Sequence, residues 1–154
     1  MRNESPVGLT RSEIETVLER DEDVLRVERI ESAKALWRVS YSFEGQPPME
    51  MLIDNGIDES YVQVLVQIDA HHLDEALSTL EPFGTVGLAM MDGMLLMRSG
   101  LCPEHSNAHA LIDGYRAVAF AHFRYREAIR SAASQPTVEA QAPGGAVPAA
   151  VPVP

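Results

Sequence analysis

The sequence predicts an α+β fold in which one antiparallel sheet is covered by helices, in the order α-β-β-β-α-β-β-α. Three observations carry this prediction. Apolar and polar residues alternate in three consecutive segments, the pattern of strands with one buried face. An Asp-Gly pair separates two further apolar segments, which indicates a hairpin. A long final segment repeats apolar residues at helical spacing.

Length and charge restrict the class of protein. The chain has 154 residues, 45% of them hydrophobic, and is long enough to bury one core. Its net charge of −11 argues against binding to nucleic acid or to an anionic membrane surface. A single cysteine excludes an internal disulfide and favours a reducing compartment. We therefore expect a cytoplasmic protein without membrane insertion, since no apolar run is long enough to span a bilayer.

The first half of the chain predicts one helix followed by three strands. Thr10 can cap a helix in which Glu13 completes a capping box, and the acidic run 21–23 ends that helix. The segment 24–30 fits neither the strand period nor the helix period, so both assignments stay open. Alternation then predicts strands over 37–43, 49–53 and 62–68, which most simply form an antiparallel meander.

The second half predicts a short helix, a hairpin and a long helix. The short helix is indicated by four apolar residues, Leu73, Ala76, Leu77 and Leu80. The hairpin joins segments 85–91 and 94–98 through Asp92-Gly93. The long helix spans 106–134 with Ser106 as its cap, and its apolar stripe is wide enough to cover a sheet. Its four arginines are expected to face outward, namely Arg116, Arg124, Arg126 and Arg130.

These elements form one predicted domain over residues 9–134. Residues 1–8 are expected to be a flexible segment that precedes it. Residues 135–154 consist mainly of Pro, Ala, Gly and Val, and they offer few large side chains to bury. This composition predicts a disordered tail.

Candidate chemistry is limited to a few polar residues. Cys102, His105 and His109 come nearest to a metal site, because the two histidines would share a helix face beside the thiol. The pattern shows no fourth ligand, and Pro103 disturbs this geometry. His122 lies in the apolar stripe of the last helix, where a histidine is more often a core or interface residue. We predict no catalytic residue, no bound metal and no cofactor, and we expect the acidic pairs to lie in exposed turns.

Methionines concentrate on the predicted hairpin and on the strand 49–53. Unbranched, flexible side chains of this kind occur at surfaces that accept varied partners, and they also fill gaps in cores. Both interpretations stay open, since one face of the sheet must be buried in either case.

The element order, size and acidity resemble the class I chaperones of bacterial type III secretion. Those proteins share a fold with the YbjN-like sensory-regulator domains. The similarity runs over residues 10–134 and is carried by the strand–turn–strand 36–53, the strand 61–69 and the block 85–98 with the last helix. The first helix departs from the family, whose opening helix is usually longer and more apolar.

The resemblance implies a homodimer without enzymatic activity that holds the extended N-terminal segment of a secreted effector. The alternative of the same fold is a YbjN-like regulatory or stress-related domain that binds another folded protein. A small metal-binding enzyme is the alternative from another class. On this chain, client contact is predicted for Val39, Tyr41, Met49, Met51 and Ile53. Self-association is predicted for Leu73, Leu77, Leu80, Met90, Met94 and Met97.

Overall fold

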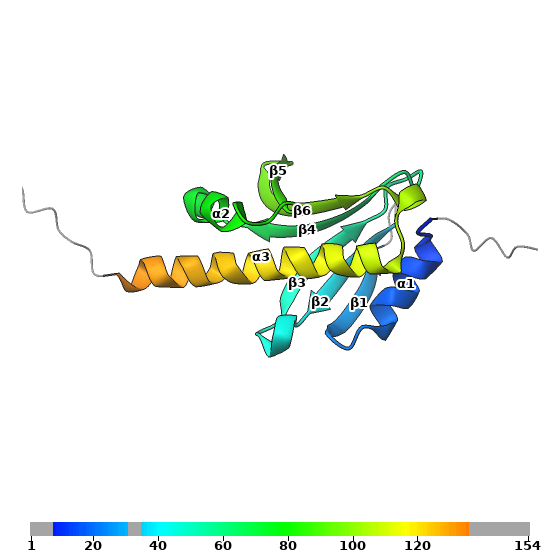
Figure 1. The fold of residues 1–154 in the computed structure, drawn as a ribbon, viewed down its shortest axis with the longest axis horizontal. Helices are drawn as coiled ribbons and strands as arrows, with labels where there is room; N and C mark the ends of the chain where they lie inside the picture. Colours follow the sequence, from blue (N-terminus) through cyan, green and yellow to red (C-terminus); the bar gives the residue numbers. More distant parts are fainter. Residues whose placement is uncertain (1–7, 31–34, 136–154) are drawn as a thin grey trace, which may run out of the picture.

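The protein is described by a computed structural model over residues 8–30 and 35–135. It consists of one six-stranded antiparallel sheet and three helices, which confirms the predicted α+β class (Figure 1). The strand order is β1-β2-β3-β4-β6-β5. The strands are β1 (Val24–Ile30), β2 (Leu36–Tyr41), β3 (Met49–Asp54), β4 (Val62–Ile68), β5 (Gly87–Met91) and β6 (Met94–Leu101). The helices are α1 (Arg11–Arg20), α2 (Leu73–Leu80) and α3 (Ala108–Ser134), with 3-10 turns η1 (Phe43–Gly45), η2 (Ala70–His72) and η3 (Pro103–His105).

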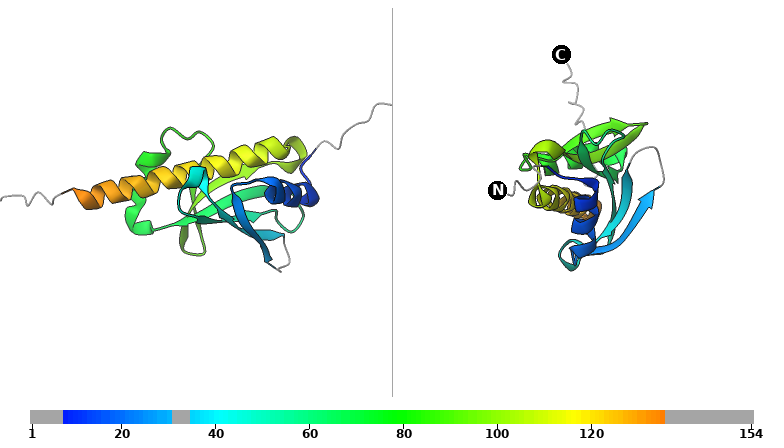
Figure 2. Two further views of the ribbon diagram at one scale, coloured as in Figure 1. Left: turned by 90° about the horizontal axis from the view of Figure 1, so that it is seen from below. Right: turned by 90° about the vertical axis from the view of Figure 1, so that its right-hand side faces the viewer.

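The helices cover one face of the sheet. Figure 2 shows the sheet curling around α3, which crosses that face, while α1 lies beside β1. Directly opposed residues of antiparallel strands share a face. The register Trp37↔Ile53↔Val64 therefore places three large apolar side chains under the helices, and all three are fully buried. The neighbouring row Arg38↔Leu52↔Leu65 lies on the other face, which carries no described helix.

The structure contains one strand more than the predicted order. The segment that the pattern left open is β1, an edge strand that pairs with β2. A register irregularity between Val24 and Arg26 interrupts it, and most of its side chains are exposed. An edge strand with a bulge shows no clean alternation, so its period is hidden in the sequence. The observed order is α-β-β-β-β-α-β-β-α.

Several predicted boundaries are shifted: β5 begins at Gly87 and not at residue 85, and β6 extends to Leu101 and not only to residue 98. Strand β2 ends at Tyr41, and Phe43 belongs to the 3-10 turn η1. Helix α3 begins at Ala108 and is capped by Asn107, whose side-chain oxygen accepts a hydrogen bond from Ala110 N at 3.0 Å. Asn caps a helix as well as Ser does, so two adjacent polar residues leave the start ambiguous. Apart from Gly8 and Gln135, the predicted terminal segments lie outside the described residues.

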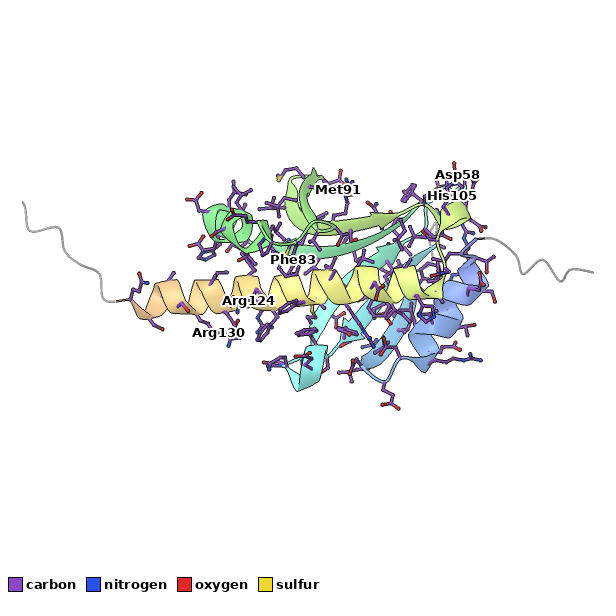
Figure 3. The ribbon with its side chains drawn as sticks, viewed as in Figure 1. Asp58, Phe83, Met91, His105, Arg124 and Arg130 are labelled. Carbon is purple, nitrogen blue, oxygen red and sulfur yellow. The ribbon has the colours of Figure 1, made fainter. Side chains whose placement is uncertain are left out.

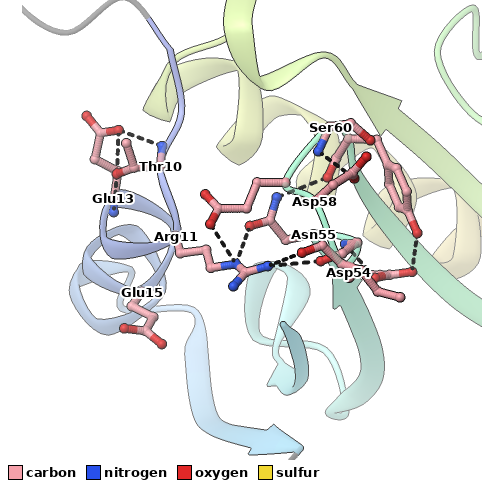
Figure 4. Close-up of polar contacts among 12 residues, drawn as sticks. Thr10, Arg11, Glu13, Glu15, Asp54, Asn55, Asp58 and Ser60 are labelled. Atoms are coloured by element: carbon pink, nitrogen blue, oxygen red, sulfur yellow. Dashed lines mark hydrogen bonds and ion pairs between the residues drawn. The ribbon is translucent and has the colours of Figure 1, made fainter. Parts of the chain in front are cut away.

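The start of α1 is fastened to the loop between β3 and β4 (Figure 4). The predicted capping box between Thr10 and Glu13 is confirmed. Arg11 then donates to the Asn55 side-chain oxygen at 3.1 Å and to the Gly56 carbonyl at 3.0 Å. Asn55 in turn donates to the Tyr61 carbonyl at 3.0 Å. The loop between β3 and β4 contains no helix or strand, and these hydrogen bonds hold it in place.

The other end of α1 is joined to α3 through a buried acid. The acidic run 21–23 was expected in an exposed turn, but the Asp21 side chain is only 7% exposed. Its carboxylate accepts a hydrogen bond from the Tyr115 hydroxyl and lies 3.8 Å from the Arg116 guanidinium. The Tyr115 ring meets Tyr41 edge-on with centroids 5.5 Å apart. Burial, and then the bond to Asp21, raise the pKa of Tyr115.

Replacing Tyr115 with Phe should destabilise the domain by about 1–3 kcal/mol, because the buried Asp21 carboxylate loses a donor. Urea unfolding followed by circular dichroism measures this difference. Arg20→Gln is the matched control, since Arg20 is exposed on the neighbouring turn. Equal stability of Tyr115→Phe and the parent protein would contradict a stabilising role for this contact.

Candidate protein-binding surface

The five residues predicted for client contact lie in the core. Each of them is at most 7% exposed, because they occupy the sheet face that the helices cover; they are Val39, Tyr41, Met49, Met51 and Ile53. Alternation identifies side chains that share a face, but it does not identify which face the helices cover. A client cannot reach these side chains in this structure. The prediction of client contact at these positions is therefore incompatible with the structure.

The residues predicted for self-association divide into two groups. Leu80 and Met97 are buried in the core. The other four are exposed and lie on α2 and on the β5–β6 hairpin: Leu73, Leu77, Met90 and Met94. Met90 is 63% exposed, the largest of these values. These four residues are candidates for an interaction surface.

Strand β5 has a free and uncharged edge. It is the last strand of the sheet, and no described strand pairs with its outer side. Its sequence, Gly-Leu-Ala-Met-Met, contains no charged residue. The opposite edge strand β1 carries Arg26, Glu28 and Arg29, the kind of charges that discourage pairing with other chains. Only the β5 edge therefore lacks charged protection within the described sheet.

The turn of the hairpin determines which backbone groups face outward. Asp92 and Gly93 have φ values of 50° and 77°, as in a type I′ turn. In such a turn the flanking residues Met91 and Met94 form a hydrogen-bonded pair, and hydrogen-bonded pairs alternate along the strand. The N–H and C=O groups of Leu88 and Met90 therefore point to the free edge.

A groove of about 790 Å³ opens beside the hairpin, and we call it the hairpin groove. It lies between α3, the end of β4, η2 and the hairpin turn. Its apolar walls include Ile68, Met94, Leu95 and Ile129, and its polar groups include His122, Tyr125 and Arg126. The Tyr125 hydroxyl accepts a hydrogen bond from Asp69 N at 3.3 Å, which joins α3 to the end of β4.

His122 lies half-buried in this groove. Burial, reinforced by the nearby positive charge of Arg126, lowers the pKa of His122 to about 4. The imidazole is therefore neutral at physiological pH.

Cys102, His105 and His109, which came nearest to a metal site in the sequence, do not form a cluster in the structure. His105 ends the 3-10 turn η3, Cys102 precedes that turn, and His109 lies in α3. Within residues 8–30 and 35–135, no group of three or more His, Cys, Asp or Glu side chains is arranged to hold a metal ion. None of the described helices is long and apolar enough to cross a bilayer.

One part of this surface carries a weak signal in the sequence. The absence of charge in residues 87–91 could have indicated an open edge. Arg126 carries no distinguishing signal, because its lack of an ion-pair partner among the described residues is visible only once the helix is placed against the sheet.

The fold resembles that of a solved structure. The crystal structure of an uncharacterized protein from Methanothermobacter thermautotrophicus matches 80% of this chain and 99% of its own chain, with a TM-score of 0.58. The two sequences are 14% identical, so the similarity concerns the fold alone. No protein-family model matches the chain, and no curated protein matches it.

The low pKa of His122 predicts a pH-dependent stability. Between pH 6.5 and about 4 the unfolded chain binds a proton at His122 that the folded chain does not, so acidification favours unfolding. Across this window the parent protein should lose about 3 kcal/mol more than His122→Gln. Urea unfolding of both proteins at several pH values measures the difference. An NMR titration that places the folded pKa of His122 near 6.5 would contradict it.

Proposed function

We propose that this protein is a non-enzymatic binding protein that holds an extended segment of another protein along strand β5. The observation that carries this proposal is the free, uncharged β5 edge with Met90 exposed beside it. The proposed partner is the N-terminal segment of a secreted effector of type III secretion, which rests on the family resemblance. The proposed compartment is the cytoplasm.

Strand addition gives a physical basis for such binding. The outward backbone groups of Leu88 and Met90 can bond to an added strand, which supplies affinity without regard to sequence. Neighbouring apolar side chains and the hairpin groove can then accept alternate side chains of that strand. Methionines suit this task, because their unbranched side chains adapt to different partners. The small side chains of Gly87 and Ala89 leave room for a second backbone.

We propose self-association through the outer side of α2. Leu73 and Leu77 are four residues apart, so they share one face of this helix, and both are exposed. Ala76 and Leu80 on the inner side are buried. A second copy that covered the two leucines would leave the β5 edge to the client.

Met90→Pro tests strand addition. Proline removes one outward N–H group of β5, while the bonds between β5 and β6 use other residues. Binding of an extended effector segment should weaken about tenfold or more, since the added strand loses a hydrogen bond and the proline ring obstructs its approach. Fluorescence anisotropy with a labelled N-terminal effector peptide measures the affinity.

Met90→Leu is the matched control, because it keeps the outward N–H and an apolar side chain. It should bind within about threefold of the parent protein. Equal affinity of Met90→Pro and Met90→Leu would contradict strand addition. It would favour the alternative, a regulatory domain whose partner is folded and contacts side chains alone.

Replacing both Leu73 and Leu77 with Asp tests the proposed dimer. Light scattering should show a dimer for the parent protein and a monomer for the double variant, because two charges would be buried without partners. Asp74→Asn, on the same helix, is the control for changes of α2 surface charge. A parent protein that is monomeric at high micromolar concentration would exclude this interface.

A further inference from the structure

Arg126 differs from the other arginines of α3 in its surroundings. Arg116 lies 3.8 Å from Asp21, and Arg124 lies 3.2 Å from Glu127 of its own helix. Arg130 is exposed to solvent. Arg126 is half-buried in the hairpin groove, and in the described part of the chain no acidic side chain lies within ion-pair distance of it.

Of the residues that line the groove only Asp69 is acidic, and its carboxylate is not within ion-pair distance of Arg126. The Asp69 carboxylate accepts a hydrogen bond from His71 N at 2.9 Å. Glu75 lies 3.7 Å from the imidazole of His72, on the η2 wall. His122 is neutral and the Tyr125 hydroxyl is bonded to Asp69, so neither supplies a negative charge. Arg126 is thus a guanidinium without an ion-pair partner among the described residues, in a protein of net charge −11.

We propose that the hairpin groove binds an acidic side chain of the extended partner segment, with Arg126 pairing to its carboxylate. The proposal rests on the proposed function and adds a sequence preference to it: an Asp or Glu next to an apolar residue. The apolar residue would pack against Ile129 and Leu95, which line the same groove. A guanidinium forms two parallel hydrogen bonds to a carboxylate, and apolar walls strengthen them by excluding water.

His122 offers a readout that depends on this contact. A carboxylate bound at Arg126 places a negative charge close to the imidazole and offsets the positive one. The pKa of His122 should therefore rise when an acidic peptide binds. A peptide that binds without a carboxylate would bury the imidazole further and would not raise the pKa of His122.

Random peptides displayed on phage are selected against the full chain, in three versions: parent, Arg126→Gln and Arg130→Gln. Arg130 lies one turn beyond Arg126, near the end of α3 (Figure 3), and does not line the groove, so it controls for loss of one charge. Peptides from the parent protein and from Arg130→Gln should be enriched in Asp or Glu beside an apolar residue. Arg126→Gln should lose this enrichment.

One selected peptide and its Glu→Gln counterpart then complete a double-mutant cycle with Arg126→Gln. The Gln peptide should bind the parent protein about tenfold more weakly, and the two peptides should bind Arg126→Gln almost equally. NMR should show that the Glu peptide, and not the Gln peptide, raises the pKa of His122.

The outcomes separate the two proposals. Selected peptides that alternate apolar and polar residues, lose affinity for Met90→Pro and show no acidic preference would overturn this inference and keep the proposed function. An acidic preference that Arg126→Gln retains would also overturn it. Failure to select any peptide that Met90→Pro weakens would overturn the proposed function itself.

Discussion

Covering one face of a six-stranded sheet with a single long helix is the constraint on which the rest of this structure depends. A helix of 27 residues is about 40 Å long, and it covers a strip about 10 Å wide. Six strands extend over about 24 Å between the two edges. Helix α3 therefore leaves both sides of the face exposed unless other elements cover them. Helix α1 covers the β1 side and is joined to α3 through Asp21 and Tyr115. On the other side α2 covers less, and the hairpin groove stays open.

The two edge strands of the sheet differ in charge and in side-chain size. Strand β1 carries charges of both signs, and its irregular register further discourages an added strand. Strand β5 has no charge, small residues at Gly87 and Ala89, and an exposed methionine. An edge of this kind carries a risk of aggregation unless a partner covers it. The acidity of the chain as a whole reduces that risk, since like charges keep free copies apart.

Much of the fold is visible in the sequence because local rules and global packing agree. Thr10 and Glu13 form the predicted capping box, and the strands that start near Trp37, Met49 and Val62 follow their alternation. The sequence-based predictions fail where contacts between distant parts of the chain determine the local structure. The edge strand β1 has no strict period, and adjacent Ser and Asn compete to cap α3. The client prediction failed for a related reason: a period of two separates the faces, but only the position of α3 shows which one is buried.

The position of Arg126 shows how local charge can oppose net charge. A chain of net charge −11 repels acidic partners at long range, but salt at physiological concentration screens exposed charges beyond about 8 Å. Inside a groove with apolar walls the screening is weaker, and the nearest charge dominates. Met94 and Leu95 of the hairpin line the same groove as Arg126 of α3. The groove that stays open beside the hairpin therefore holds a guanidinium without an ion-pair partner among the described residues.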